Sequence, residues 1–204
     1  MMNRYFVLAA AMLPLSACSS LFAENSNSFF ATPDAAGNLN ELDNVSYSSN
    51  NVSPLTGNGY AYQVGGNDGD GLRGYAGIIN GTGVTAPPTS GTASMSGSYA
   101  LAGIANIYEY GSGYNQTTVA GTPFTDGGSI TLTADYGAGT LTGSAGFSYP
   151  ITVNGTISGT TLRGTVTYDG VTGPLEGLVG AIEAVGAFHG NSDTQLHAGG
   201  FIVN

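Results

Sequence analysis

The sequence predicts an all-β protein, an eight-stranded antiparallel up-and-down β-barrel that follows a short β-hairpin and a flexible N-terminal tether. Three observations support this fold class. Apolar and polar residues alternate through four short segments between Ser129 and Tyr168, as they do along strands. Glycine accounts for 34 of the 204 residues, while only 8% of the residues are charged. No long stretch has the periodicity of a helix, so a helical bundle is excluded.

The first seventeen residues are typical of a bacterial signal peptide. A short apolar run follows Arg4 and is too short to span a membrane as a stable helix. The segment Leu15-Ser16-Ala17-Cys18 then resembles a lipobox, and Cys18 has no second cysteine with which to pair. We therefore expect lipidation of Cys18, which would anchor the mature chain to a membrane. Ser19 stands where an inner-membrane lipoprotein carries aspartate, which favours the outer membrane; the sequence does not distinguish its periplasmic from its surface side.

Two segments precede the expected barrel. Residues 18–55 are rich in Ser, Asn, Ala and Pro, which predicts a flexible tether. Residues 56–87 form a short N-terminal β region, in which two alternating segments flank a Gly/Asp-rich turn at 65–71 and predict a hairpin. Asp and Asn oxygens in this turn can surround a calcium ion. The turn lacks the closing glutamate of an EF-hand loop, and the same residues suit turns with positive φ, so we expect a turn without metal.

Residues 88–204 supply the expected barrel. Closure of the sheet would remove the exposed edges that a glycine-rich sheet otherwise presents. Small residues such as Gly143 and Ala145 occur among the inward candidates, which indicates an interior filled by side chains rather than a ligand cup. The longest loop is expected between Gly111 and Gly127. The eight strands are expected over 92–101, 104–110, four segments of 129–168, 178–189 and 196–203.

The charge of the chain limits its partners. Three Arg and Lys residues stand against thirteen Asp and Glu residues, and the net charge is −10. Nucleic acid is excluded as an expected partner, because phosphate contacts need clustered Lys or Arg. No nucleophile, acid and base stand out together, so we expect no enzymatic activity. We also expect a monomer, with no metal site.

Two histidines are candidate binding residues. His189 and His197 flank a turn near the C-terminus and would lie across from each other near one rim of the barrel. There they could bind haem iron or another metal, or titrate as a pair near neutral pH. The alternative, which we favour, is a pair of exposed residues at the ends of a loop, because no third ligand is evident beyond Asp193.

Tyrosines near the longest loop form the second candidate group. Tyr108, Tyr110 and Tyr114 lie close in sequence to Asn115. Tyrosine can ligate haem iron and builds adaptable binding surfaces. It is also a favoured strand residue that sits half-buried with its hydroxyl in water. If the barrel carries a recognition surface, we expect it at this rim, since loops on a rigid scaffold commonly carry binding sites.

Four short motifs follow one another through the expected barrel: Pro88–Tyr99, Tyr136–Gly143, Ala181–Phe188 and Ala198–Val203. In order and spacing they resemble the β-barrel domain of transferrin-binding protein B and its small lipoprotein relatives, with Met95 in place of a tyrosine. The resemblance implies an outer-membrane lipoprotein that acts as a non-enzymatic binding module for a protein or a small solute such as haem, with no other cofactor. Transferrin binding does not carry over, because the chain has room for only one barrel. The alternative is a structural envelope lipoprotein that binds no small molecule.

Overall fold

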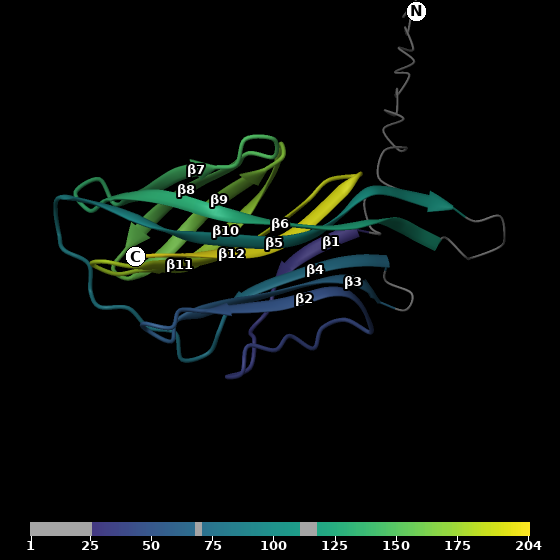
Figure 1. The fold of residues 1–204 in the computed structure, drawn as a ribbon, viewed down its shortest axis with the longest axis horizontal. Helices are drawn as coiled ribbons and strands as arrows, with labels where there is room; N and C mark the ends of the chain where they lie inside the picture. Colours follow the sequence, from purple (N-terminus) through teal and green to yellow (C-terminus); the bar gives the residue numbers. More distant parts are fainter. Residues whose placement is uncertain (1–25, 68–70, 111–117) are drawn as a thin grey trace, which may run out of the picture.

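A computed structural model describes residues 26–67, 71–110 and 118–204. These residues form two layers, a closed β-barrel and a four-stranded sheet that lies along one side of it (Figure 1). Within the described ranges, no helix has the length and apolar character needed to cross a membrane. The expected signal peptide and the expected lipidation site at Cys18 lie outside the described residues.

The barrel confirms the predicted closed, antiparallel, up-and-down architecture. Each strand pairs with its neighbours in sequence, and the last strand closes the sheet against the first. Within the described residues the eight barrel strands are β5 (Thr92–Tyr110), β6 (Thr118–Asp135), β7 (Thr140–Ala145), β8 (Ile151–Ser158), β9 (Thr161–Tyr168), β10 (Val171–Val179), β11 (Ala184–Asn191) and β12 (Gln195–Val203).

Several strand boundaries differ from those predicted. Residues 92–110 form the single long strand β5 instead of two strands, and residues 118–127, expected in a loop, belong to β6. Residues 178–189 contain the end of β10, a turn and the start of β11. The cause is burial on both faces: residues 101–104 and 184–190 are buried throughout. Such stretches read as continuous apolar runs, which hide the alternation that marks a strand.

The predicted hairpin is present and forms the centre of a larger sheet. Its strands are β3 (Gly59–Asn67) and β4 (Gly71–Ile78), flanked by β2 (Asn44–Val52) and by β1 (Ser26–Phe30), which runs parallel to β4. Both flanking strands fall in the segment expected to be a flexible tether. Nearly every residue of β2 is exposed, as befits an edge strand, so its Ser- and Asn-rich composition does not reveal it.

The barrel wall separates two cores. One core fills the barrel interior, in agreement with the expected filled interior, and includes Leu101, Leu132 and Phe188. The other lies between the barrel and the sheet, where Tyr60 and Val64 pack on barrel residues such as Leu196. Strands β11 and β12 contribute to both cores because successive side chains point to opposite faces of a strand.

Asn58 ties the sheet to one end of the barrel. This buried amide donates from Nδ2 to the Gly83 carbonyl at 2.9 Å and to Glu183 Oε1 at 3.1 Å. Its Oδ1 accepts a hydrogen bond from the Gly83 amide at 2.8 Å. Both amide hydrogens and one lone pair of Oδ1 are therefore used, which holds the two layers in one arrangement.

Candidate functional site

Strands β5 and β6 extend beyond the other barrel strands as a two-stranded ribbon (Figure 1). Tyr108 pairs with Ala120 and Tyr110 with Thr118 in this ribbon. The tip of the ribbon, residues 111–117, lies outside the described residues, and with it the candidate residues Tyr114 and Asn115. The described part of the expected rim therefore consists of the ribbon and the barrel mouth at its base.

A β-bulge decides which way the ribbon tyrosines face. The pairing of β5 with β6 shifts between Ala105 and Tyr108, and Asn106 has a positive φ of 51°. Ala105 opposes Thr122 and Tyr108 opposes Ala120, so both lie on the face that continues the barrel interior. Ile107, on the other face, packs into the core between barrel and sheet. Without the extra residue, Tyr108 and Tyr110 would point to the side of the sheet.

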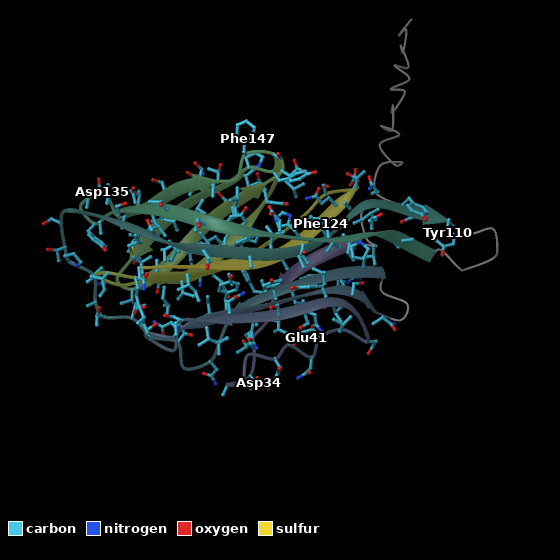
Figure 2. All side chains as sticks on the ribbon, viewed as in Figure 1. Asp34, Glu41, Tyr110, Phe124, Asp135 and Phe147 are labelled. Atoms are coloured by element: carbon cyan, nitrogen blue, oxygen red, sulfur yellow. The ribbon has the colours of Figure 1, made fainter. Side chains whose placement is uncertain are left out.

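The ribbon tyrosines are exposed because no barrel strand covers that face beyond the mouth. Tyr108 is 58% exposed and Tyr110 is 53% exposed, with their ring centroids 5.8 Å apart. Phe124 lies on the same face nearer the barrel and is partly buried against its interior core. Figure 2 shows Tyr110 at the far end of the ribbon and Phe124 near its base.

A second aromatic feature stands at the same end of the barrel, in the loop between β7 and β8. The sequence pattern places Phe147 on a strand, but β7 ends at Ala145 and Gly146 turns the chain with a φ of 78°. Phe147 is fully exposed and projects from the barrel (Figure 2), and Tyr149 is more than half exposed. The signal that could have revealed this loop is the Gly-x-x-x-Pro spacing from 146 to 150, which interrupts a strand.

A cavity of about 270 Å³ opens between this loop and the base of the ribbon. At its wall the rings of Phe124 and Tyr168 stack, with centroids 6.1 Å apart and an interplanar angle of 13°. Asp126 accepts a hydrogen bond from the Tyr99 hydroxyl at 3.3 Å. Burial, followed by the hydrogen bond to Asp126, raises the pKa of Tyr168, so its hydroxyl stays protonated at neutral pH.

The histidines are buried, in contrast to the expected exposed positions at the ends of a loop. His189 opposes Ala198 across β11 and β12, whereas His197 opposes Gly190. Neighbouring residues on a strand point to opposite faces, so the two imidazoles lie on opposite sides of the barrel wall. They do not converge on one ligand. Within the described residues, no group of three or more His, Cys, Asp and Glu side chains could hold a metal ion.

His189 belongs to the interface between barrel and sheet. Its Nδ1 lies 2.9 Å from Ser28 Oγ, and its ring meets the edge of Phe30 at a centroid distance of 4.5 Å. Ser28 Oγ donates to Asn191 Oδ1 at 3.1 Å, so its hydrogen points away from His189. His189 must then donate from Nδ1, and it does not act as a base toward Ser28 in this arrangement. Burial lowers the pKa of His189 to about 4.

His197 lies inside the barrel, next to Tyr168 of the cavity wall. Its ring contacts Tyr168 and Phe188 in edge-to-face geometry, with centroid distances of 5.5 and 6.2 Å. Gly190 leaves room for this ring, since a Cβ there would come within 2.7 Å of His197 Cε1. Burial, with a smaller effect of His189, lowers the pKa of His197 to about 4, so the ring is neutral at pH 7.

Comparisons with known proteins find similarity among solved structures. No family model and no curated protein matches the chain. Three solved structures to which it is similar are a surface lipoprotein (16% identity, 78% of this chain and 81% of that chain, TM-score 0.43), a transferrin-binding protein B from Haemophilus parasuis (16%, 78% and 37%, 0.42) and HpuA from Kingella denitrificans in complex with human haemoglobin (17%, 71% and 55%, 0.37).

These matches include transferrin-binding protein B, the protein whose barrel domain the four sequence motifs resemble. The chain covers 37% of that transferrin-binding protein B and 55% of HpuA, so it spans only part of the length of each. At 16–17% identity and TM-scores of 0.37–0.43, these similarities do not transfer a partner or an activity. Function has to be argued from the open end of the barrel.

Proposed function

We propose that the protein is a non-enzymatic binding module of the outer membrane, anchored by a lipid on Cys18, which binds a protein partner through the open end of its barrel. The observation that carries the proposal is the pair Tyr108 and Tyr110, which stand more than half exposed on a ribbon face that the fold leaves uncovered. Exposed apolar surface on a rigid scaffold marks interaction sites more often than chance placement does.

The chemistry of this face suits a protein partner. Tyrosine offers a large contact area with few rotatable bonds, and aromatic residues are enriched in the buried centres of interfaces. The bulge at Asn106 places Tyr108 and Tyr110 on the ribbon face that continues the barrel interior, opposite to the core in which Ile107 packs. The net charge of −10 favours a partner whose contact surface is basic, because complementary charge raises association rates.

The buried Ser28–His189 pair does not support a hydrolase. Both side chains are enclosed between barrel and sheet, and the serine hydrogen is directed to Asn191. Neither residue lines the cavity at the barrel mouth. A nucleophile needs access to substrate and a base that accepts its proton, and this arrangement provides neither. The pair is better explained as a hydrogen-bonded joint between the two layers.

A photo-crosslinking experiment tests the proposed function. A photoreactive amino acid placed at Tyr110, in cells that produce the protein and are supplied with serum as a source of protein partners, should form adducts with a defined protein. The same group at Leu55, which is 77% exposed on a turn of the sheet, serves as the matched control. The purified partner should bind the Tyr108→Ser/Tyr110→Ser variant about tenfold or more weakly than wild type, whereas Leu55→Ser should bind unchanged.

The alternative, a structural envelope lipoprotein, predicts a different result. Photoreactive groups at 110 and 55 would then give the same adducts, and the Tyr108→Ser/Tyr110→Ser variant would bind every captured protein as well as wild type does. Either outcome would contradict the proposal that the open end of the barrel is the recognition surface.

A further inference from the structure

The cavity at the barrel mouth has a lining of mixed chemistry that the protein-binding proposal does not explain. It lies between the base of the β5–β6 ribbon and the 146–150 loop, with a volume of about 270 Å³. Three aromatic rings, two carboxylates and one amide are central to its chemistry: Phe124, Tyr149 and Tyr168, Asp126 and Asp169, and Gln195.

The amide of Gln195 lacks a partner. Its Nε2 atom is buried and makes no hydrogen bond to any residue that the structure describes. Two residues along β12 on the same inward face, both ring nitrogens of His197 are also buried without a described partner. A buried polar atom without a hydrogen bond is costly and calls for a water molecule or a ligand. Gln195 lines the cavity, so its unpaired donor is available to a molecule that enters there, whereas His197 is not among the lining residues.

The lining excludes several classes of occupant. No Lys or Arg is among the lining residues, and Asp126 and Asp169 would repel an anion. A purely apolar molecule would leave the Gln195 donor unpaired. An organic cation that lacks an acceptor oxygen, such as methylguanidinium, would pair with the carboxylates and rings but would leave Gln195 Nε2 unpaired.

A neutral ring that carries several hydroxyl groups satisfies the two carboxylates, the Gln195 donor and the aromatic rings together. Its hydroxyls can donate to Asp126 and Asp169 and accept from Gln195, while its apolar face stacks on an aromatic ring. Tyr149 is suited to this stacking, because it lines the cavity and more than half of it is exposed. Asp126 is held in place by the Tyr99 hydroxyl, so its carboxylate is already oriented.

We propose that the barrel mouth binds one neutral pyranose sugar, either free or as the terminal residue of a glycan on a protein partner. The volume of about 270 Å³ suits a single ring, since it lies just below the usual range of drug-sized pockets. The glycan form rests on the protein-binding function proposed above. The free sugar form is independent of it.

The test is NMR titration of residues 19–204, which lack the expected signal peptide and Cys18, with four methyl glycosides. These are the methyl glycosides of D-glucose, D-galactose, D-mannose and N-acetylglucosamine. At least one should bind and shift the resonances of β6 and β12. Gln195→Leu and Tyr149→Ala should each weaken that binding about tenfold or more. Gln195→Leu should remain folded, because it removes an unpaired buried donor. Phe147→Ala is the matched control on the same loop, and it should bind as wild type does.

The remaining outcomes distinguish a free sugar from a sugar at the end of a glycan, and they show which results would contradict sugar binding. Binding of an immobilised glycan that ends in the same sugar, at least tenfold tighter than the methyl glycoside, assigns the glycan form; equal binding assigns the free sugar. The Tyr108→Ser/Tyr110→Ser variant should keep its sugar binding, so failure of the protein-binding function is distinguishable. Absence of binding by all four glycosides, equal binding by every variant, or binding of methylguanidinium in their place overturns the proposal.

Discussion

Individual residues at the wall between the two layers make the fold sensitive to pH. Burial holds the pKa values of His189 and His197 at about 4, against an ordinary value of 6.5. Below pH 6.5 the unfolded chain therefore binds protons that the folded chain does not. The stabilising effect of two neutral imidazoles is fully present above pH 6.5 and is lost as the pH falls toward 4.

We expect the free energy of unfolding to fall between pH 7 and pH 5.5, by at most about 1.4 kcal/mol per pH unit for each histidine. Urea denaturation at these two pH values measures the change, in a range where most carboxylates stay ionised. The control is His197→Gln, which removes one titrating group from the barrel interior and should reduce the pH dependence by about half. A wild-type protein equally stable at both pH values would contradict the neutral, buried state of the two rings.

Residue burial was also where sequence reasoning was least successful. His189 and His197 stand beside a polar turn, a setting that is typical of exposed residues. Their burial results from two neighbours far away in the chain: β1 covers His189 from outside, and the ring of Tyr168 covers His197 inside the barrel. No local pattern around either histidine encodes those contacts.

At the scale of elements, glycines allow barrel strands to approach one another closely. Gly173 on β10 faces the backbone of β11, where an added Cβ would overlap the His189 carbonyl oxygen and lie 2.6 Å from the Gly190 Cα. Backbone atoms in a closed sheet cannot move aside as a flexible side chain can. Here the requirement is for space, because Gly173 does not have a positive φ.

Gly173→Ala should therefore destabilise the protein by about 2 kcal/mol or more, as other overpacked cores are destabilised. The control is Gly83→Ala, whose Cβ would have nothing within 4 Å and which should change stability little. Urea denaturation of both variants measures their free energies of unfolding and shows whether a Cβ at position 173 destabilises the protein. Equal stability of the two variants would show that β10 and β11 can separate without cost.

The ribbon is the element whose role depends most on a single irregularity. A period-two pattern carried through residues 104–110 puts Ile104 and Tyr108 on one face, and the bulge separates them. Tyr108 and Tyr110 could be named as candidates from composition and position. The face that these two tyrosines occupy could not be predicted, because a bulge arises from pairing with β6 rather than from a signal within β5.

At the scale of the whole molecule, the expected lipid would orient the barrel relative to the membrane. Seven residues separate Cys18 from Ser26, the start of β1, and the eight steps between these two residues span at most roughly 29 Å. β1 begins near the end that carries the ribbon (Figure 1). Ile182, which precedes β11, lies at the opposite end because β11 runs toward the ribbon.

We expect energy transfer to membrane headgroup acceptors to be stronger from a fluorophore on Asn27→Cys than from one on Ile182→Cys in the lipidated protein. Cys18 is blocked by its lipid, so each introduced thiol is labelled alone. Cys18→Ala should release the protein from the membrane fraction. Retention of that variant on the membrane, or equal transfer from both labels, would contradict lipid anchoring at this end.

Sequence alone determined the fold class and the closed antiparallel topology, since alternation and turn residues are local properties of successive hairpins. The expected total of eight strands agrees with the structure only because the division of β5 into two strands offset the missing strand β10. The low content of Arg and Lys argues against nucleic acid as a partner, and the lipobox-like segment predicts lipidation of Cys18. Only the tertiary structure decided that residues 26–30 and 44–52 are strands, that both histidines are buried, and that Phe147 and the ribbon tyrosines are exposed. Those properties depend on which surfaces meet when a second layer packs on the barrel, and contacts between distant segments leave no periodic trace in the chain.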